Sequence, residues 1–206
     1  MGTDFRDLDN DGWKDIFVTR GDVLSRAMPG TTTNQFNSVF RNPGASGKWA
    51  ALTEEAGLDA APATRHRGLA LGDLDGDGRM DVVTTAIGGP AEIWINRSPQ
   101  SSHWLDIALE GVKSNRLALN ARVRATAGDL VQLGEVISGG SYLSQNDLRL
   151  HFGLGSHDRL DKAEIIWPNG KVELLLNLLA DRFYVVREGS GVISSKPAEA
   201  GKTARP

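Results

Sequence analysis

A nine-residue acidic segment that occurs twice constrains this chain more than any other feature. The first copy runs from Asp7 to Asp15, and the second runs from Asp73 to Asp81, 66 residues later. Each copy has Asp at positions 1, 3, 5 and 9 and Gly at position 6, so the carboxylates belong to Asp7, Asp9, Asp11, Asp15, Asp73, Asp75, Asp77 and Asp81. Four carboxylates in one short loop repel one another, so the folded loop needs a neutralising charge.

This spacing predicts a Ca²⁺ loop in each copy. Ca²⁺ is a hard cation that accepts roughly six to eight oxygen ligands in a flexible shell, which a short loop can supply. The glycine permits the sharp turn, and the main-chain carbonyl at position 7, from Trp13 or Arg79, can add an oxygen. Solvated acidic turns are the alternative, since Asp and Gly are common turn residues. Two copies with identical spacing favour calcium.

An EF-hand shares the first half of this loop but requires Glu at position 12 and a helix on each side. Position 12 is Val18 in the first copy and Thr84 in the second. The residues after each loop are β-branched and aromatic, which is typical of strands. The sequence therefore predicts that the loops connect strands and are not EF-hands.

Composition excludes several classes of protein. The chain has no cysteine, so disulfides, thiolate metal sites and thiol nucleophiles are absent. No segment reaches the roughly 18 consecutive apolar residues that indicate a membrane span. The loops hold eight of the 26 acidic residues, which leaves 18 acids against 23 Lys and Arg. This mild basic excess is too weak and too dispersed to predict nucleic-acid binding.

Three segments follow from the pattern along the chain. Residues 1–97 contain the two loops and short strand candidates, and the 66-residue offset suggests propeller blades. A polar linker near 96–102 leads into a strand-rich second unit, 98–188, without acidic loops. Alternation in segments such as 121–127 and 148–154 predicts antiparallel sheets packed as a sandwich. Residues 189–206 have little apolar content and are predicted to form a disordered tail.

Two sets of residues carry a family resemblance. The Asp loops resemble the calcium-binding FG-GAP (VCBS-type) repeats of integrin-α-like β-propellers. The second unit resembles the ASPIC/UnbV domain in its motifs Lys113-Ser114-Asn115-Arg116, Gly140–Gln145, His151–Gly155 and Ile166–Val172. Together they resemble the C-terminal part of the cartilage acidic protein 1 family, up to about Glu188. The family usually has Gly where this chain has Asn120, and Asn tolerates a left-handed backbone.

The resemblance implies an all-β fold, with a partial β-propeller of FG-GAP-type blades followed by a β-sandwich-like ASPIC/UnbV domain. Two repeats cannot close a propeller, so we expect the sequence to be a piece of a longer protein. The resemblance also implies an exported product, extracellular or periplasmic, and the absence of the cysteine-rich modules of animal members favours a bacterial source.

The leading functional hypothesis is a calcium-binding, non-catalytic binding or adhesion module for a protein or carbohydrate ligand. The alternative is a carbohydrate-active or other enzyme that uses the propeller as a scaffold, since one fold hosts many functions. The carboxylates suited to acid–base work are predicted to bind metal. His66, between two arginines, is expected at the surface, and Ser144 lacks an evident activating base in the sequence.

An anionic ligand is a further hypothesis. Alternation places Arg122 and Arg124 opposite the apolar side of their strand, and Arg149 and His151 opposite that of theirs. If the two strands are neighbours in one sheet, these four side chains form an exposed basic patch, for which an acidic polysaccharide is a plausible partner. The competing interpretation is a set of solubilising residues on an exposed face.

Overall fold

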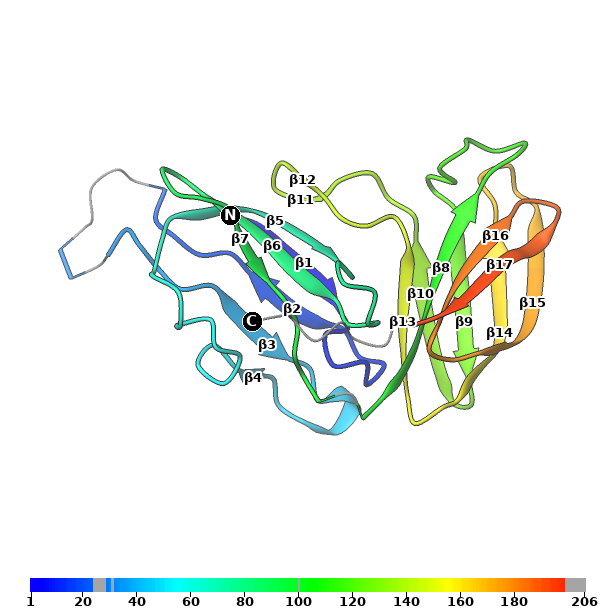
Figure 1. The fold of residues 1–206 in the computed structure, drawn as a ribbon, viewed down its shortest axis with the longest axis horizontal. Coiled ribbons are helices and arrows are strands. Elements are labelled where there is room, and N and C mark those ends of the chain that lie inside the picture. The colour runs from blue at the N-terminus through cyan, green and yellow to red at the C-terminus, as the bar shows by residue number, and fades with distance from the viewer. Residues whose placement is uncertain (24–28, 31, 100, 199–206) are drawn as a thin grey trace.

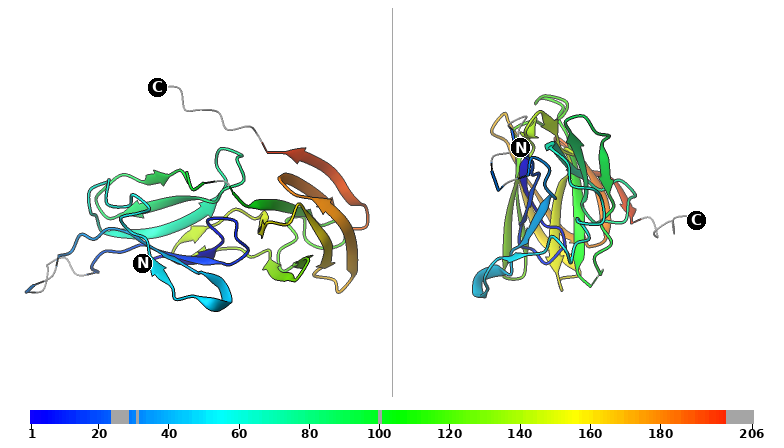
Figure 2. Two further views of the ribbon diagram at one scale, coloured as in Figure 1. Left: turned by 90° about the horizontal axis from the view of Figure 1, so that it is seen from below. Right: turned by 90° about the vertical axis from the view of Figure 1, so that its left-hand side faces the viewer.

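The computed structural model describes residues 1–23, 29–30, 32–99 and 101–198. The elements in these ranges are strands, apart from one short 3₁₀ turn, η1, at Gly44–Ser46. They form two units that lie end to end, with β1 to β7 in one unit and most of the later strands in the other (Figures 1 and 2). The all-β prediction is confirmed.

The first unit consists of two antiparallel sheets that resemble propeller blades. The first has the order β1-β2-β3-β4 and the second the order β5-β6-β7. The strands are β1 (Thr3–Arg6), β2 (Asp15–Val18), β3 (Ser38–Arg41), β4 (Ala50–Ala51), β5 (His66–Gly72), β6 (Asp81–Ala86) and β7 (Glu92–Trp94). Each acidic loop connects the first two strands of its sheet, which agrees with the rejection of an EF-hand.

The two blades pack on one apolar cluster. Phe17 and Val39 from the first sheet are buried against Leu69, Leu71 and Val82 from the second. Successive residues of a strand point to opposite faces, so Leu69 and Leu71 face the same side of β5. The cluster therefore joins β2, which follows the first acidic loop, to β5 and β6, which lie on both sides of the second.

The loops have matching backbone conformations. Position 4 is Asn10 in the first loop, with φ of 62°, and Gly76 in the second, with φ of 78°. Position 6 is Gly12, with φ of 95°, and Gly78, with φ of 85°. These left-handed values suit Gly and, less well, Asn. Asn120 likewise has φ of 71°, so Asn adopts the left-handed turn where the family usually has Gly.

The second unit is a sandwich of two four-stranded sheets, with the orders β10-β9-β14-β15 and β13-β8-β16-β17. A large apolar core lies between them and includes Leu105, Ile107, Val123, Phe152 and Ile165. The strands are β8 (His103–Glu110), β9 (Arg122–Ala127), β10 (Leu130–Glu135), β13 (Leu150–Gly155), β14 (Arg159–Ile166), β15 (Val172–Leu179), β16 (Arg182–Arg187) and β17 (Gly191–Pro197).

Two sequence predictions for this unit need correction. Antiparallel sheets were expected, and most strand pairs are antiparallel, but β16 pairs with β8 in parallel. The predicted disordered tail is wrong for its first part, because β17 pairs antiparallel with β16. This strand buries little apolar surface, since Val192 and Ile193 are exposed, and backbone pairing on the sheet edge holds it instead. Residues 199–206 of the predicted tail and residue 100 of the predicted linker lie outside the described ranges.

An arm of the second unit, residues 137–149, reaches across to the blades (Figure 1). It contains the short strands β11 (Gly140–Ser141) and β12 (Ser144–Gln145). Along β5, the Leu69 amide donates to Ser144 Oγ at 3.1 Å, and the Leu71 amide donates to Asn146 Oδ1 at 2.9 Å. The arm therefore ties the sandwich to the second blade by main-chain hydrogen bonds of β5.

The two units also meet directly at the acidic loops. The ring of Trp104, from β8, lies against Gly78, where a side chain would overlap it. A Cβ atom at Gly153, in β13, would lie 2.7 Å from both the Cα and the carbonyl carbon of Asn10. Such distances are too short for carbon atoms, so glycine at 78 and 153 lets the units approach this closely.

We expect Gly153→Ala to loosen this contact. The added methyl group forces the first loop away from β13, and overpacking of this kind costs about 1–3 kcal/mol. The melting temperature should fall by several degrees, measured by circular dichroism. Gly89→Ala is the matched control, because its Cβ would meet only Ala86 Cβ at 3.7 Å. Equal melting temperatures for the two variants would show that the close approach contributes nothing to stability.

Candidate metal centres

Three carboxylates converge in each acidic loop. One oxygen from each of Asp7, Asp9 and Asp15 lies within 4.8 Å of the other two, and the same holds for Asp73, Asp75 and Asp81. The members occupy positions 1, 3 and 9 of each loop, and the first and the ninth are buried. Loop positions far apart in sequence thus supply oxygen atoms to one point, as a metal site requires.

Main-chain amides hold the carboxylates of the first loop. Gly12 N donates to Asp7 Oδ2 at 2.7 Å, and Leu8 N donates to Asp15 Oδ2 at 3.0 Å. Asn42 N, at the end of β3, donates to Asp15 Oδ1 at 2.8 Å. Asp7 and Asp15 are therefore positioned by the backbone of the loop and of the neighbouring strand.

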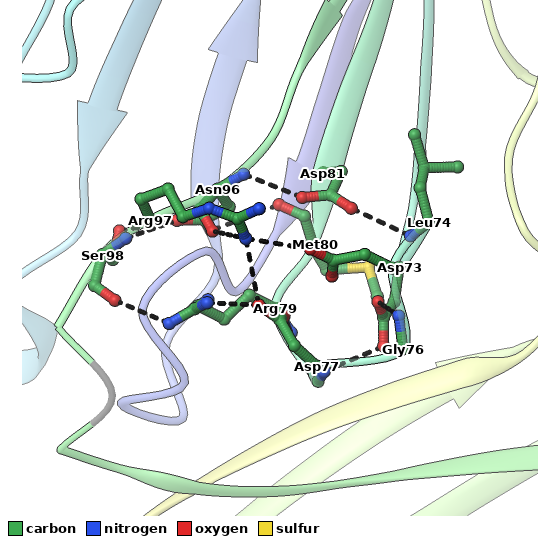
Figure 3. A network of polar contacts seen from close by, with 12 residues as sticks. Asp73, Leu74, Gly76, Asp77, Arg79, Met80, Asp81, Asn96, Arg97 and Ser98 are labelled. Atoms are coloured by element: carbon green, nitrogen blue, oxygen red, sulfur yellow. Dashed lines mark hydrogen bonds and ion pairs between the residues drawn. The ribbon is translucent and has the colours of Figure 1, made fainter. Parts of the chain in front are cut away.

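The second loop repeats this arrangement (Figure 3). Gly78 N donates to Asp73 Oδ2 at 2.9 Å. Leu74 N donates to Asp81 Oδ2 at 2.9 Å. Asn96 N, just after β7, donates to Asp81 Oδ1 at 2.8 Å. The two loops therefore share their hydrogen bonds as well as their residue spacing.

The pair Asn42 and Asn96 was missed in the sequence. Besides its main-chain bond, Asn42 Nδ2 donates to Lys14 O at 3.2 Å, and Asn96 Nδ2 donates to Met80 O at 3.2 Å. Both acceptors stand at position 8 of their loops. Asn96 Nδ2 also donates to Leu8 O at 2.7 Å, which ties the second site to the first loop. The sequence did contain a signal, because the segments 38–42 and 92–96, both strand candidates, each end in Asn.

Buried oxygens test whether a cation fits these clusters. Among the described residues, Asp7 Oδ1 and Asp75 Oδ1 are buried and accept no hydrogen bond. An unsatisfied buried carboxylate oxygen is costly, and a hard cation would satisfy it. Burial raises the pKa of Asp7 to about 7 and that of Asp15 to about 6, and it also raises the pKa of Asp73 and Asp81. The donor set is all oxygen and fits Ca²⁺.

The carboxylates at position 5 lie outside the three-oxygen clusters. Asp11 Oδ2 is 3.6 Å from Arg41 Nη2, and Arg41 Nε is 2.7 Å from Asp9 Oδ2. In the second loop Asp77 contacts the guanidinium groups of Arg79 and Arg97 (Figure 3). The ligand roles of Asp11, Asp77 and the main-chain carbonyls of Trp13 and Arg79 therefore remain predictions.

A buried polar chain links both loops to the sandwich. Asn10 Nδ2 donates to Gly78 O at 3.0 Å, and Asn10 Oδ1 lies 2.7 Å from His151 Nε2. His151 Nδ1 lies 2.7 Å from Asp106 Oδ1. Burial lowers the pKa of His151, but the Asp106 charge outweighs it, and the net pKa is raised. A protonated His151 donates from both nitrogens, which matches its two oxygen partners.

The predicted basic patch of Arg122, Arg124, Arg149 and His151 is wrong. Strands β9 and β13 belong to different sheets, and the His151 side chain is only 2 % exposed. Arg149 contacts Asp147, donates to Asp73 O at 3.1 Å and lies 5.2 Å from the ring centroid of Phe183. Alternation correctly placed Arg149 and His151 away from the sandwich core, but the blades cover that side.

His66 is also misplaced by the sequence analysis. It was expected at the surface, yet it is 2 % exposed. Its Nε2 lies 2.8 Å from both Glu92 Oε2 and Thr64 Oγ1, and its Nδ1 lies 3.1 Å from Arg20 O. The flanking arginines were misleading because alternation along β5 turns His66 to the opposite face.

Comparison with known proteins agrees with this geometry. Residues 5–84 match the FG-GAP-like repeat family, and residues 111–193 match the ASPIC and UnbV family. The two matched ranges follow one another along the chain and together cover most of it. It is 28% identical to cartilage acidic protein 1 of Xenopus tropicalis over 170 residues, or 81% of this chain and 25% of that protein. The Mus musculus and Homo sapiens proteins of the same name are each 26% identical over 81% of this chain.

The resemblance inferred from the motifs is thus confirmed. The chain spans about a quarter of the length of the curated relatives it matches. Within the described residues, no helix has the length and apolarity needed to cross a membrane.

The raised pKa values predict how stability depends on pH when calcium is chelated. Folded Asp7, with a pKa of about 7 against the ordinary 3.8, keeps its proton between these values whereas the unfolded chain loses it. Stability therefore falls as pH rises from about 4 to about 7, by about 1.4 kcal/mol for each unit of raised pKa. Thermal melts in chelator should show this fall for the parent and a weaker fall for Asp7→Asn. Identical pH profiles would exclude Asp7 as the titrating group.

Proposed function

We propose that this chain is part of an extracellular, non-catalytic binding or adhesion module in which each acidic loop binds one Ca²⁺. The single observation that carries the calcium assignment is the repeated cluster of three carboxylate oxygens, held by the same main-chain amides in both loops. The similarity to FG-GAP-like repeats and to cartilage acidic protein 1 supports the extracellular setting. Millimolar calcium in such a setting would fill even weak sites.

The proposed carboxylate ligands are Asp7, Asp9 and Asp15 in one site and Asp73, Asp75 and Asp81 in the other. Asp11, Asp77 and the carbonyls of Trp13 and Arg79 are proposed to complete the two shells. Arg41 and Arg97, which pair with carboxylates at positions 3 and 5, have half-exposed side chains that can turn away to solvent. Bound Ca²⁺ supplies the positive charge that lets every carboxylate stay ionised.

The loops give calcium a structural role beyond each blade. Asn10 and Gly78 contact the sandwich through His151 and Trp104, so fixing the loops also fixes the surface on which the ASPIC/UnbV domain rests. We infer that calcium stabilises the orientation of the two units. A binding module needs such rigidity when its ligand contacts both units, because ordering a mobile surface on binding lowers affinity.

The side chains considered for acid–base chemistry support binding over catalysis. Ser144 Oγ accepts from Leu69 N at 3.1 Å and donates to Tyr142 O at 2.8 Å, so the hydroxyl is used to attach the arm to β5. His66 and His151 are buried and hydrogen-bonded to side chains and main-chain groups inside the protein. These contacts give Ser144, His66 and His151 structural roles that do not require a catalytic step.

Calorimetric titration of chelator-stripped protein tests the calcium assignment. We expect two sites for Ca²⁺ and weaker binding of Mg²⁺, because a flexible shell of many oxygens suits the larger ion. Asp81→Asn should remove one site and leave the other. Asp59→Asn, an exposed acid in a turn of the same unit, is the control and should keep both sites. A flat titration of the parent at millimolar calcium would refute the proposal.

The variant Asp77→Ala distinguishes two roles for Asp77, that of a calcium ligand and that of an ion-pair partner of arginine. If Asp77 is a ligand, the variant should melt several degrees below the parent in calcium, and the difference should shrink in chelator because one repulsion is gone. If Asp77 serves only Arg79 and Arg97, the loss should be equal in both conditions. The measurement is a pair of thermal melts for each protein, with and without excess chelator.

A further inference from the structure

A cleft lies between the first blade and the sandwich. Its volume is about 530 Å³, and both units line it. The blade contributes Arg6 and Lys14, which flank the first and last carboxylates of loop 1, while the sandwich contributes Arg122, Gln132 and Leu133. The cleft exists only because the two units are joined, so neither unit contains it alone.

The cationic side chains of the cleft are not equally neutralised. Arg149 pairs with Asp147, and Arg122 Nε lies 3.4 Å from Glu135 Oε2. By contrast, Arg6 Nη1 is 3.9 Å from Asp4 Oδ1, at the outer limit of an ion pair. Lys14 Nζ lies 3.5 Å from the Leu133 carbonyl oxygen, a long contact that carries no opposite charge.

The acids that line the cleft are already engaged. Glu135 and Asp147 pair with the arginines just named, and Asp7 belongs to the carboxylate cluster of loop 1. The two blade cations, Arg6 and Lys14, therefore keep capacity for a further anion. A cleft between low-dielectric walls strengthens their attraction for an anion.

We propose that this cleft binds an acidic saccharide, whose carboxylate or sulfate group is held by Arg6 and Lys14, with Arg122 at the rim. This inference rests on the proposed function as a binding module and assigns its ligand class and location. Arginine suits carboxylate and sulfate groups because its rigid fork of donors can bond two oxygens of either group, and lysine adds a compact charge.

The uncharged part of the cleft suits sugar rings. Its volume falls within the roughly 300–1,000 Å³ of small-molecule sites. Leu133 and Ile137, which line it, are 69% and 43% exposed and offer aliphatic surface for the C–H faces of a ring. Gln132, whose Nε2 donates to Gly153 O at 2.6 Å, presents its amide oxygen as an acceptor for hydroxyl groups.

Calcium and the anion should bind cooperatively. Arg6 and Lys14 are the chain neighbours of Asp7 and Asp15, so ionised, metal-free carboxylates would oppose an anion in the cleft. One bound Ca²⁺ would cancel two of the four negative charges of loop 1 and weaken this opposition. Saccharide affinity should therefore fall on chelation, and by linkage the saccharide should raise calcium affinity by the same factor.

Calorimetry on the full chain in millimolar calcium tests the site. The probes are a sulfated heparin disaccharide, digalacturonate, inorganic sulfate and neutral cellobiose. We expect one or both acidic disaccharides to bind, with affinity that falls at high salt, and cellobiose not to bind. Lys14→Gln and Arg6→Gln should each weaken binding about tenfold, as the loss of a charged hydrogen bond does. Arg124→Gln, on the same strand as Arg122 but outside the cleft, is the matched control.

The outcomes separate the two proposals. A normal calcium titration with no binding of either acidic disaccharide overturns the cleft assignment and leaves the calcium proposal intact. Equal weakening by Arg124→Gln, tight cellobiose binding, or sulfate binding as tight as the disaccharides also overturns it. If Lys14→Gln or Arg6→Gln fails to fold, as judged by its melt, Arg122→Gln at the exposed rim replaces it and should weaken binding several-fold.

Discussion

The structure depends on the burial of mutually repelling carboxylates at the start and end of two short loops. Asp7, Asp15, Asp73 and Asp81 are all buried, and removing a charge from water costs several kcal/mol unless partners compensate for it. Main-chain amides, with Asn42 and Asn96 from neighbouring strands, supply part of that compensation. The raised pKa of Asp7 shows that the amides do not suffice. Solvated turns would have left these carboxylates exposed, so their burial favours the proposed cation in each loop.

The same loops form the surface against which the sandwich packs. Asn10 reaches Gly78 on one side and His151 on the other, and Trp104 lies against Gly78. Its indole stacks near His151 with 6.1 Å between the ring centroids and meets Phe183 edge to face at 4.9 Å. A change in loop geometry must therefore be accommodated by the aromatic contacts of the second unit. Under the proposed function, metal binding and the orientation of the units would be coupled through these side chains, because a close-packed interior transmits strain.

The sequence predicted what depends on local chemistry. Ligand spacing located the carboxylate clusters, and period-2 alternation placed Val123 and Ala125 in the core with Arg122 and Arg124 outside. The sequence analysis failed where the environment of a side chain depends on which element packs against that face of its strand. Arg149 and His151 point away from the sandwich core as predicted, yet that direction leads into the blades. The roles of Asn42 and Asn96 required knowledge of which strand ends lie beside which loop. The strand at 191–197 is held by backbone pairing, which leaves little trace in side-chain pattern.

The cleft gives the hypothesis of an anionic partner a different location from the one that the sequence suggested. A mildly basic remainder, outside the loops, pointed to an anionic partner, but the cations gather between the units and not on one sheet face. The electrostatic potential around these cations depends on the charge of the acidic loops beside them. With all eight loop carboxylates ionised the formal net charge is −3, and two bound divalent cations would bring it above zero. Arg6 and Lys14 lie beside loop 1, each one residue from a buried carboxylate, Asp7 or Asp15. If the cleft binds an anion as proposed, a loop made less negative by calcium would strengthen that binding without any movement of the chain.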